Sequence, residues 1–394
     1  MVATQTNRYS TNISQISCQT GELGTDSHPW EQRQLGEVGE IHNGRDYKHL
    51  QPGNIPVYGT SGYMLSVDDA LSWNDDAVGI GRKGTIDKPC ILRAPFWTVD
   101  TLFFVTPRSS TPLEFLFTLF ESVNWKSKDE STGVPSLTNQ AIVNTAVKVP
   151  DTSEQHQIGV FFSTLDNLIA AAERQEDLLR QKKQAYLQLM FPREGETEPR
   201  LRFKGFSGQW HQRQLGELYA PSREKNDGSF SAKDIISVAG MRYASREPAD
   251  SSDDYMRTYN VMRVGDIAFE GHTSNEFAFG RFVENDLGDG IVSHVFVVLR
   301  PLPGRRYDLA FWKEAIHDEL LMRRILARST KRSTMMHEIV VPDFLKETVR
   351  VPSLPEQLRI GDIFKTFDML ITVSHQRVET LQKAKSAYLQ RMFL

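Results

Sequence analysis

The sequence predicts an α+β protein of two tandem mixed α/β domains, each followed by a long helix, with the two helices pairing as an antiparallel coiled coil of pseudo-two-fold symmetry. Three observations support this prediction. Two segments occur twice, the second segment of each copy has the periodicity of a long helix, and strand-like and helix-like stretches lie between them. A chain of 394 residues is long enough for two such domains with their own cores.

The duplication is visible by eye. The motif Trp30–Glu37 recurs as Trp210–Glu217 with a single difference at its second position. The segment Val149–Phe191 recurs without a gap as Val351–Phe393, with 19 identities over 43 aligned positions. Because the offset rises from 180 to 202 residues, the stretch between the two motifs is 22 residues longer in the second copy. We infer one scaffold that is used twice and carries two different inserts.

The second repeated segment has the pattern of a long amphipathic helix. Apolar residues follow one another in steps of four and three from Ile158 onward, which is a heptad pattern, and Glu176 and Lys183 interrupt this seam. Thr152 and Gln155 have the spacing of a capping box. Each helix would have about 37 residues and a length of roughly 55 Å. A helix packed only on its own domain is the alternative, but two matched seams in one chain favour an antiparallel pair.

The predicted organisation begins with a disordered N-terminal tail at residues 1–29, a first mixed domain at 30–150 and a first long helix at 151–191. A linker at 192–209 leads to a second mixed domain at 210–350 and a second long helix at 351–394. Short runs bounded by Gly, Pro, Asn and Asp predict strands at Ile55–Tyr58, Ala77–Ile80, Thr101–Val105, Asp266–Phe269 and Ile291–Leu299. Helices are expected at Leu113–Val123 and Asp308–Ser329. Both domains therefore run from strands to a helix and back to a strand.

Composition and charge exclude several classes of protein. No apolar run has the length of a membrane span, and no cluster of Cys and His has the spacing of a zinc site. Of the two cysteines, Cys18 and Cys90, the first lies in the predicted tail, so a structural disulfide is not expected and a reducing cytoplasmic location fits. The net charge of −4 excludes a simple polycation that coats nucleic acid. A DNA-binding protein of this charge must confine its cations to patches. One patch is Arg323, Arg324, Arg328, Lys331 and Arg332, with no acidic residue from Leu320 to Met336.

A glycine-rich stretch in the first domain imitates a cofactor motif. Gly79–Gly84 matches the dinucleotide-binding fingerprint by letter, but that motif must open a helix. Thr85 and Pro89 follow instead, so we reject the cofactor interpretation. The stretch favours a turn that exposes Arg82 and Lys83 to phosphates or guanine edges. A surface hairpin with two solvated cations is the alternative.

The matching place in the second domain follows a strand of the same character. It carries hydrogen-bonding side chains over Glu270–Asn275 where the first domain has a basic pair. Two domains that bind different sequences would differ in this way, although an ordinary polar loop also fits.

A search for catalytic motifs predicts a protein without chemistry of its own. The sequence lacks the Asn-Pro-Pro-aromatic tetrapeptide of DNA methyltransferases, a glycine-rich AdoMet loop and a Walker A motif. Pro150-Asp151 and Pro342-Asp343 lack the Glu-x-Lys partner of a nuclease, and turn chemistry accounts for both.

The repeated motifs resemble a known family. Two copies of Trp-x-Gln-Arg-Gln-Leu-Gly-Glu, and two copies of Val-Pro-x-x-x-Glu-Gln-x-x-Ile-Gly at the start of a long helix, resemble the specificity subunit of type I restriction–modification enzymes. Further stretches agree with this resemblance, namely Ile55–Gly62, Ile80–Gly84, Phe96–Thr101, Val134–Thr138 and Leu201–Phe206. The resemblance covers about Trp30 to Leu394, and its specificity lies in the order of the pieces.

The resemblance implies that the mixed domains are target-recognition domains, each reading half of a bipartite target in double-stranded DNA. The helices would space them and bind two methyltransferase subunits, which restriction and motor subunits then join. AdoMet, ATP and Mg²⁺ would belong to those partners, and this chain would have no cofactor or metal. The expected DNA contacts are Thr60, Ser61, Arg82, Lys83 and Thr85 in the first domain, and His272, Thr273, Ser274, Asn275, Arg323, Arg328, Lys331 and Arg332 in the second.

Two other functions stay open from the sequence. The chain could be a coiled-coil scaffold that binds proteins and not DNA, or the detached specificity arm of a fused methyltransferase–nuclease. AdoMet-dependent methylation by the isolated chain would favour the fused enzyme. Failure to bind a specific duplex together with a methyltransferase subunit would favour the scaffold.

Overall fold

The computed structural model describes residues 29–108, 110–129, 131–193, 195–244, 253–275, 277–303, 307–333 and 336–393. The tail expected at residues 1–29 lies outside these ranges except for its last residue. Contacts divide the chain into two units. Unit 1 contains the residues up to Ala172 and those from Arg377 onward, and unit 2 contains Glu173–Gln376. Across the described part of the chain, no helix is both long enough and apolar enough to cross a membrane.

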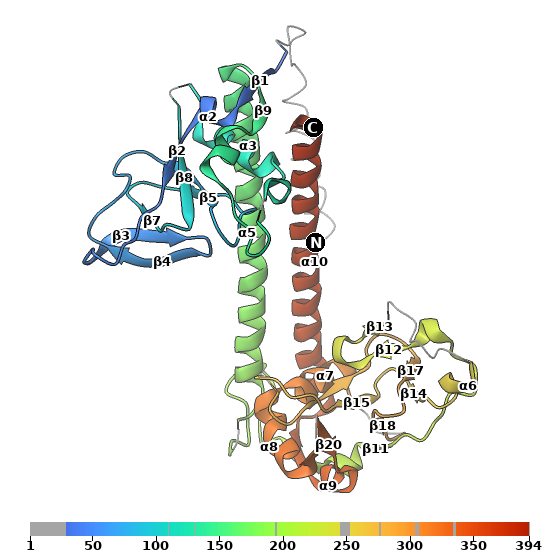
Figure 1. Cartoon of the computed structure of the whole chain (residues 1–394). Coiled ribbons are helices and arrows are strands. Elements are labelled where there is room, and N and C mark those ends of the chain that lie inside the picture. Colours follow the sequence, from blue (N-terminus) through green and yellow to red (C-terminus); the bar gives the residue numbers. More distant parts are fainter. Residues whose placement is uncertain are drawn as a thin grey trace. The chain divides into compact units, whose positions relative to one another are not determined.

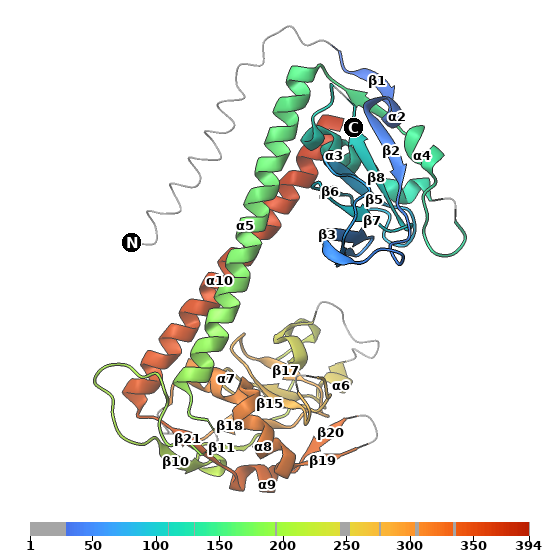
Figure 2. The same ribbon diagram turned by 90° about the vertical axis from the view of Figure 1, so that its left-hand side faces the viewer.

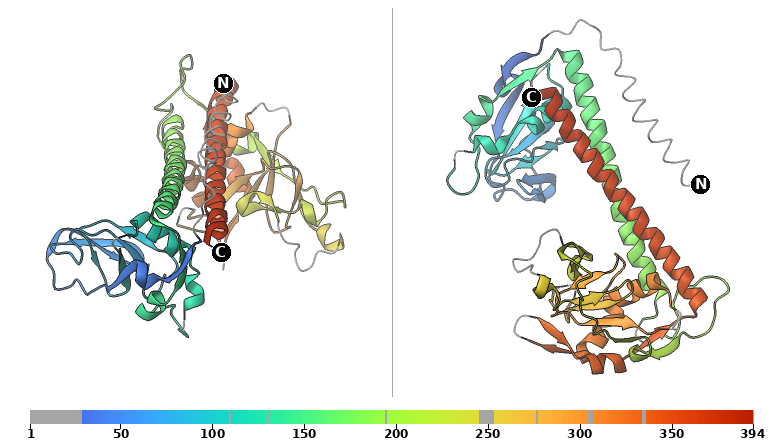
Figure 3. Two further views of the ribbon diagram at one scale, coloured as in Figure 1. Left: turned by 90° about the horizontal axis from the view of Figure 1, so that it is seen from above. Right: turned by 90° about the vertical axis from the view of Figure 1, so that its right-hand side faces the viewer.

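Unit 1 is built on a four-stranded antiparallel sheet in the order β2-β8-β5-β6, with bounds Gly39–Asn43, Leu102–Pro107, Ala77–Gly81 and Cys90–Leu92 (Figure 1). A smaller sheet has the order β4-β3-β7, with bounds Gly62–Val67, Pro52–Gly59 and Trp97–Thr98. Helix α3 (Leu113–Ser122) is amphipathic and buries Phe115 and Phe120 in a core that it shares with β5 and β8. The right-hand view of Figure 3 shows the blue and teal strands of this unit beside the green start of helix α5 (Thr152–Met190).

Unit 2 repeats this plan. Its main antiparallel sheet has the order β11-β18-β15-β16, with bounds Tyr219–Pro221, Val298–Pro301, Ile267–Glu270 and Arg281–Glu284. In both sheets the strand that comes last along the chain, β8 or β18, lies between the first strand, β2 or β11, and the second strand, β5 or β15. The strand order is therefore the same in the two sheets. Helix α7 (Leu309–His317) takes the place of α3 after the last strand. The two domains therefore have related α+β folds.

The smaller elements complete each unit. Unit 1 also contains α2, a 3-10 turn and α4, at Leu35–Val38, Trp125–Lys128 and Asn139–Val143. Unit 2 also contains three short 3-10 turns at Leu215–Glu217, Ala232–Asp234 and Val238–Gly240, and α6, α8 and α9 at Asp253–Met256, Glu319–Ser329 and Val341–Lys346. Its short strands β12, β13, β14, β17, β19 and β20 span Ile236–Ser237, Arg242–Tyr243, Asn260–Met262, Gly290–Val292, Thr330–Arg332 and His337–Ile339.

The repeated motifs form the frame of each domain. Strand β1 (Glu31–Gln34) pairs with β9 (Ala146–Val149), and β10 (His211–Gln214) pairs with β21 (Thr348–Val351) in the same register. The Trp of each motif packs on a Phe at the end of a long helix, either its last residue (Phe393) or the residue just after it (Phe191). Trp30 contacts Phe393 at 5.4 Å between ring centroids, and Trp210 contacts Phe191 at 5.9 Å.

The helix-opening motif has a structural explanation in its Gln and Gly. The side-chain amide of Gln155 donates to the carbonyl of Pro150 at 2.9 Å, and Gln357 repeats this bond to Pro352 at 3.0 Å. A Cβ at Gly159 would lie 2.8 Å from the backbone nitrogen of Phe115, so only glycine lets α3 approach α5 this closely. These contacts do not depend on what the domain binds, which is why both copies share them.

Each long helix is split between the units. Helix α5 belongs to unit 1 up to Ala172, and helix α10 (Leu354–Phe393) belongs to unit 2 up to Gln376. Within unit 1, Phe161 contacts Tyr388, and Phe162 contacts Phe393 near the end of α10.

The same pairing occurs in unit 2 at the other ends of the helices. Tyr186 contacts Phe367, and Phe191, further along α5, contacts Phe364, earlier in α10. Residues later in α5 therefore contact residues earlier in α10, so the helix segments of unit 2 run antiparallel.

Three sequence predictions about local structure are wrong. The stretch Ile291–Leu299 is not one strand, because a turn separates β17 from β18. The helix expected at Asp308–Ser329 is two helices, because the Asp318 side chain accepts hydrogen bonds from Leu320 and Leu321 and starts α8.

The third error concerns the start of α5. The Asp151 carboxylate, not the Thr152 hydroxyl, accepts the bond from the Glu154 nitrogen at 2.9 Å. The expected capping box is absent because Gln155 bonds to Pro150.

Candidate nucleic-acid interface

The connection from β5 to β6 carries the basic pair predicted from the sequence. Gly81 leads into a loop and not into a helix, as expected from Thr85 and Pro89. The Arg82 nitrogen donates to the carbonyl of Thr101 at 2.8 Å, and the Arg82 carbonyl accepts from the Leu137 nitrogen at 2.8 Å. The backbone is thus held from both sides.

The side chains of Arg82 and Lys83 are exposed. The Arg82 guanidinium makes one long bond, 3.4 Å to the Asp100 carbonyl, and lies 5.8 Å from the centre of the Phe103 ring. A loop whose backbone is held in place and whose Arg82 and Lys83 side chains are exposed is suited to contact a polyanion.

A hairpin tip lies beside this loop. Thr60 and Ser61 form the turn between β3 and β4, with Ser61 exposed and Thr60 half-buried. A Cβ at Gly84 would lie 3.9 Å from the Thr60 hydroxyl, which places the turn against the loop. Thr85 is half-buried behind it, and its carbonyl leaves no room for a side chain at Gly81. The five residues predicted in the first domain are therefore brought together.

A hollow adjoins these two elements. Two connections, β2 to β3 and β7 to β8, and strand β4 contribute its lining, which contains carboxylates, a lysine and the exposed Met64. The lining residues are Asp46, Tyr47, Lys48, Met64, Val99, Asp100 and Thr101. Carboxylate oxygens accept hydrogen bonds from the exocyclic amines of cytosine and adenine. No sequence motif indicates this hollow, because the residues that line it are far apart along the chain.

The corresponding connection of unit 2 runs from β15 to β16. His272, Thr273, Ser274 and Asn275 are all exposed on it. The His272 ring lies 2.5 Å from the buried Glu270 carboxylate through Nδ1, which fixes the direction of the imidazole. The expected equivalence of the two loops is correct by topology, since both connect the same two strands of the sheet.

A β-hairpin brings the predicted basic residues to this loop. The His337 nitrogen on β20 donates to the Gly271 carbonyl at 2.8 Å, so β19 and β20 lie against the loop. Lys331 and Arg332 on β19 are exposed. Figure 2 shows the hairpin projecting beyond α8. In unit 1 the segment Pro135–Leu137 clamps its loop in the same way.

The remaining basic residues of the predicted patch lie on α8. Arg328 forms a two-bond ion pair with Glu347, one bond being 2.9 Å long, so its charge is partly compensated. Arg323 is exposed on the same helix. Among the described residues, the side-chain partner of Arg328 is Glu347 on the segment after α9, and not the loop at His272.

Arg281 is a further cation at this loop that no sequence motif singles out. It lies opposite Glu270 at the start of β16, donates to the Ala239 carbonyl at 2.7 Å, and covers the Phe277 ring at 4.8 Å. Its position directly after the loop would have been a usable signal. The arginine adds positive charge to the base of the loop in unit 2.

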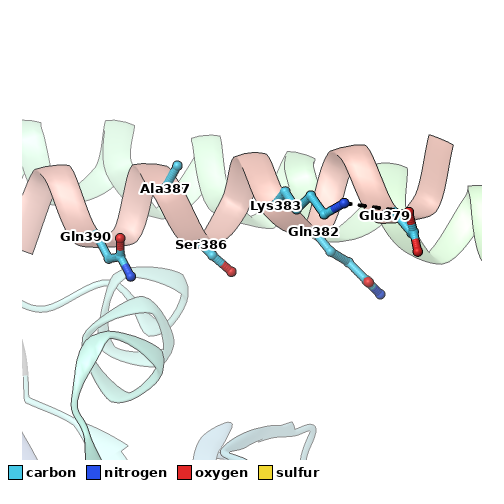
Figure 4. Close-up of a pocket in the computed structure, with 6 residues that line it drawn as sticks. All are labelled: Glu379, Gln382, Lys383, Ser386, Ala387 and Gln390. Carbon is cyan, nitrogen blue, oxygen red and sulfur yellow. Dashed lines mark ion pairs between the residues drawn. The ribbon is translucent and has the colours of Figure 1, made fainter. Parts of the chain in front are cut away.

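Another hollow lies along α10 and has a different character. It is lined by Glu379, Gln382, Lys383, Ser386, Ala387 and Gln390, all from this one helix (Figure 4). Side chains from a single helix do not converge on a ligand, so this is a polar helix face and not a substrate pocket.

Comparisons with known proteins agree with this geometry. Residues 27–181 match the family model described as type I restriction modification DNA specificity domain. The chain is 23% identical over 345 residues to the type I restriction enzyme MjaVIII specificity subunit of Methanocaldococcus jannaschii, covering 81% of this chain and 76% of that protein.

Two solved structures share the fold. The S subunit of a type I restriction–modification system from M. genitalium has a TM-score of 0.65 at 12% identity, covering 95% of this chain and 98% of that one. A chain from a study of complex assembly in a type I R-M system has a TM-score of 0.52 at 15% identity, covering 93% and 98%. The resemblance inferred from the repeats is confirmed: the chain is similar to specificity subunits of type I restriction–modification enzymes.

Proposed function

We propose that this chain is the sequence-specific DNA-recognition subunit of a type I restriction–modification complex. One observation carries the proposal. The same strand connection, in two domains of the same strand order, carries Arg82 and Lys83 in one and His272–Asn275 in the other. Two domains with the same strand order and different exposed side chains fit a bipartite target, because the two halves of such a target have different sequences.

The chemistry of the two loops supports different readout. Arginine can bind the O6 and N7 of guanine with two bonds, whereas Asn, Ser, Thr and His offer both donors and acceptors. Lys331 and Arg332 add phosphate contacts, which position the protein without selecting sequence. We assign residues 30–150 and 210–350 as the two target-recognition domains.

Residues 151–191 and 351–394 serve as spacer helices, and residues 192–209 as the linker. Asp166 of α5 pairs with Lys385 of α10, and Lys183, 17 residues later in α5, pairs with Asp368, 17 residues earlier in α10. Both pairs fit one antiparallel register, which supports a single coiled coil with pseudo-two-fold symmetry. A coiled coil of roughly 55 Å corresponds to about one and a half turns of DNA.

The chain directs methylation and cleavage and performs neither. Two methyltransferase subunits bring AdoMet, and restriction subunits bring ATP and Mg²⁺. The relatives found by comparison support this division, since they are specificity subunits by name.

Methylation-aware long-read sequencing of the host genome, with and without the gene, tests the proposal. We expect a two-part methylated motif that disappears with the gene. Unchanged methylation, together with no specific duplex binding by the chain and its methyltransferase subunit, would favour the protein-binding scaffold. Methylation by the isolated chain would favour the fused enzyme.

Removing one heptad from each long helix tests the spacing role. We expect unchanged half-sites and a changed distance between them. If the preferred distance stays the same, the helices do not measure it.

A further inference from the structure

A largely enclosed lysine of each long helix forms ion pairs with two acids. Lys385 of α10 donates to Asp166 of α5 at 2.5 Å and to Glu121 of α3 at 2.6 Å. Only 12% of the lysine side chain is exposed, and its ammonium lies 5.7 Å from the centre of the Phe117 ring. Unit 1 therefore contains a Lys–Asp–Glu triad where its two long helix segments meet the domain.

Unit 2 contains the same triad in reversed roles. Lys183 of α5 lies 2.7 Å from Asp368 of α10 and 2.8 Å from Glu314 of α7. Its side chain is 18% exposed. Lys183 and Lys385 occupy equivalent positions of the repeat, as do Asp166 and Asp368. Lys183 is one of the residues that interrupt the heptad seam, so this interruption now has a partner on each side.

The glutamates of the two triads come from different places. Phe115 of α3 and Phe311 of α7 are structural counterparts, since each packs on the terminal Phe of a long helix. Glu121 lies six residues after Phe115, whereas Glu314 lies three residues after Phe311. The glutamate of unit 2 therefore lies about one helical turn earlier on its helix than that of unit 1, yet each glutamate reaches the lysine at the equivalent position of the repeat. The duplication of a single glutamate does not explain two glutamates at different helix positions. We therefore infer that the ion triad itself is required.

Stability does not explain such a requirement. Burial raises the pKa of Glu121 and that of Glu314, although a lysine lies beside each carboxylate. Buried ion pairs are commonly no better than apolar side chains of the same volume. A polar group in a coiled-coil seam does fix register, because any shift buries it without a partner.

We propose that the two triads are register locks: they act as positioning residues that hold α5 and α10 in one antiparallel register and thereby set the distance between the half-sites. That the triads hold the register does not depend on the proposed function. That the register sets the distance between half-sites rests on the proposed function. A shift of one heptad moves one helix by about 10 Å along the other. That distance is about three base pairs at 3.4 Å each.

Cross-linking of cysteine pairs with a short thiol-reactive bifunctional reagent measures the register directly. In a background with Cys18 and Cys90 replaced by Ser, Tyr186→Cys with Phe367→Cys reports the native register, because these two side chains are in ring contact, with 5.4 Å between centroids. Tyr186→Cys with Ser374→Cys reports a shift of one heptad.

Each reporter is combined with an apolar variant, in which both lysines become Met and the four acids become Leu. The acids are Asp166, Asp368, Glu121 and Glu314. The matched control changes Lys182 and Lys383 to Met, because both are exposed lysines of the same helices.

We expect the shifted cross-link to rise about tenfold in the apolar variant over the control, the size of coupling seen between residues in contact. Exchanging the charges, as Lys183→Asp with Asp368→Lys and Lys385→Asp with Asp166→Lys, should restore the native cross-link. If the apolar variant is not folded, each triad is replaced separately, and a shift in either single-triad variant supports the lock. Only native cross-links in every folded variant would overturn it.

Duplexes with spacers changed one base pair at a time form the second arm. The apolar variant should accept spacers about three base pairs from the preferred length, while the control does not. A shifted cross-link with an unchanged spacer preference would refute the link between register and half-site distance. If the unaltered protein binds no specific duplex but the cross-link still shifts, the proposed function fails and the lock stands.

Discussion

Replacing Arg82 by Ala is the most direct test of the reading loop. The exposed side chain contributes one 3.4 Å bond and one ring contact at 5.8 Å, and the main-chain bonds to Thr101 and Leu137 do not need it. We therefore expect a loss of folding stability below about 1 kcal/mol. Assembly with partner subunits should be unchanged.

The expected loss in DNA binding is larger. A bidentate arginine–guanine contact contributes about 1–3 kcal/mol of discrimination, or about 5- to 150-fold in affinity. This loss should fall on the half-site that the first domain reads. A duplex with that half-site scrambled should already bind weakly, and Arg82→Ala should weaken it little further.

Fluorescence anisotropy with the assembled complex measures both duplexes, once the half-sites are known from the methylation map. Arg93→Ala is the matched control, because Arg93 lies in the same unit and is bound to Asp76 at 2.6 Å. Equal weakening of cognate and scrambled duplexes would mean that Arg82 contacts only phosphate. An unchanged affinity for both would refute its role in binding.

Three further outcomes are expected. Lys331→Ala and Arg332→Ala should each weaken binding to all duplexes alike and lower the slope of log affinity against log salt by about one, as measured by a salt titration. Gly159→Ala should lower the free energy of unfolding by about 1–3 kcal/mol in urea melts, because the added methyl group meets the Phe115 backbone; an unchanged midpoint would show that α3 can move away. Glu284 is 1% exposed, and burial raises its pKa to about 9. The folded state then keeps a proton that the unfolded chain releases, so the stability of unit 2 should fall as the pH rises from about 4.5 to 9. Glu284→Gln should flatten that dependence in thermal melts, and equal slopes would contradict the burial argument.

The frame was predictable from the sequence because it occurs twice. Matching Trp30 with Trp210 and Val149 with Val351 located both pairs of framing strands and both long helices. The ends of short elements could not be predicted from the repeat, because a single side chain decides where such an element begins or ends. Asp318 breaks one predicted helix in two, and Asp151 replaces Thr152 as the cap.

The candidate interface was predictable only where its residues are close in sequence. The loops at Arg82 and His272 were found from their neighbours along the chain. The hollow beside Asp100 and the packing of the β19–β20 hairpin on Gly271 depend on contacts between distant segments. Arg281 lacked a motif and was missed for that reason.

The two-stranded pairing of β1 with β9 has a consequence for how the domain tolerates change. The chain enters the first domain at Gln34 and leaves it at Ala146, and these two residues are direct partners. In the second domain Gln214 and Thr348 are partners in the same way. Everything between is a closed loop whose ends are tied together, and the cost of closing a loop grows only slowly with its length. Residues can therefore be gained or lost inside either domain without moving the helix that follows, as the 22 additional residues of the second copy already illustrate.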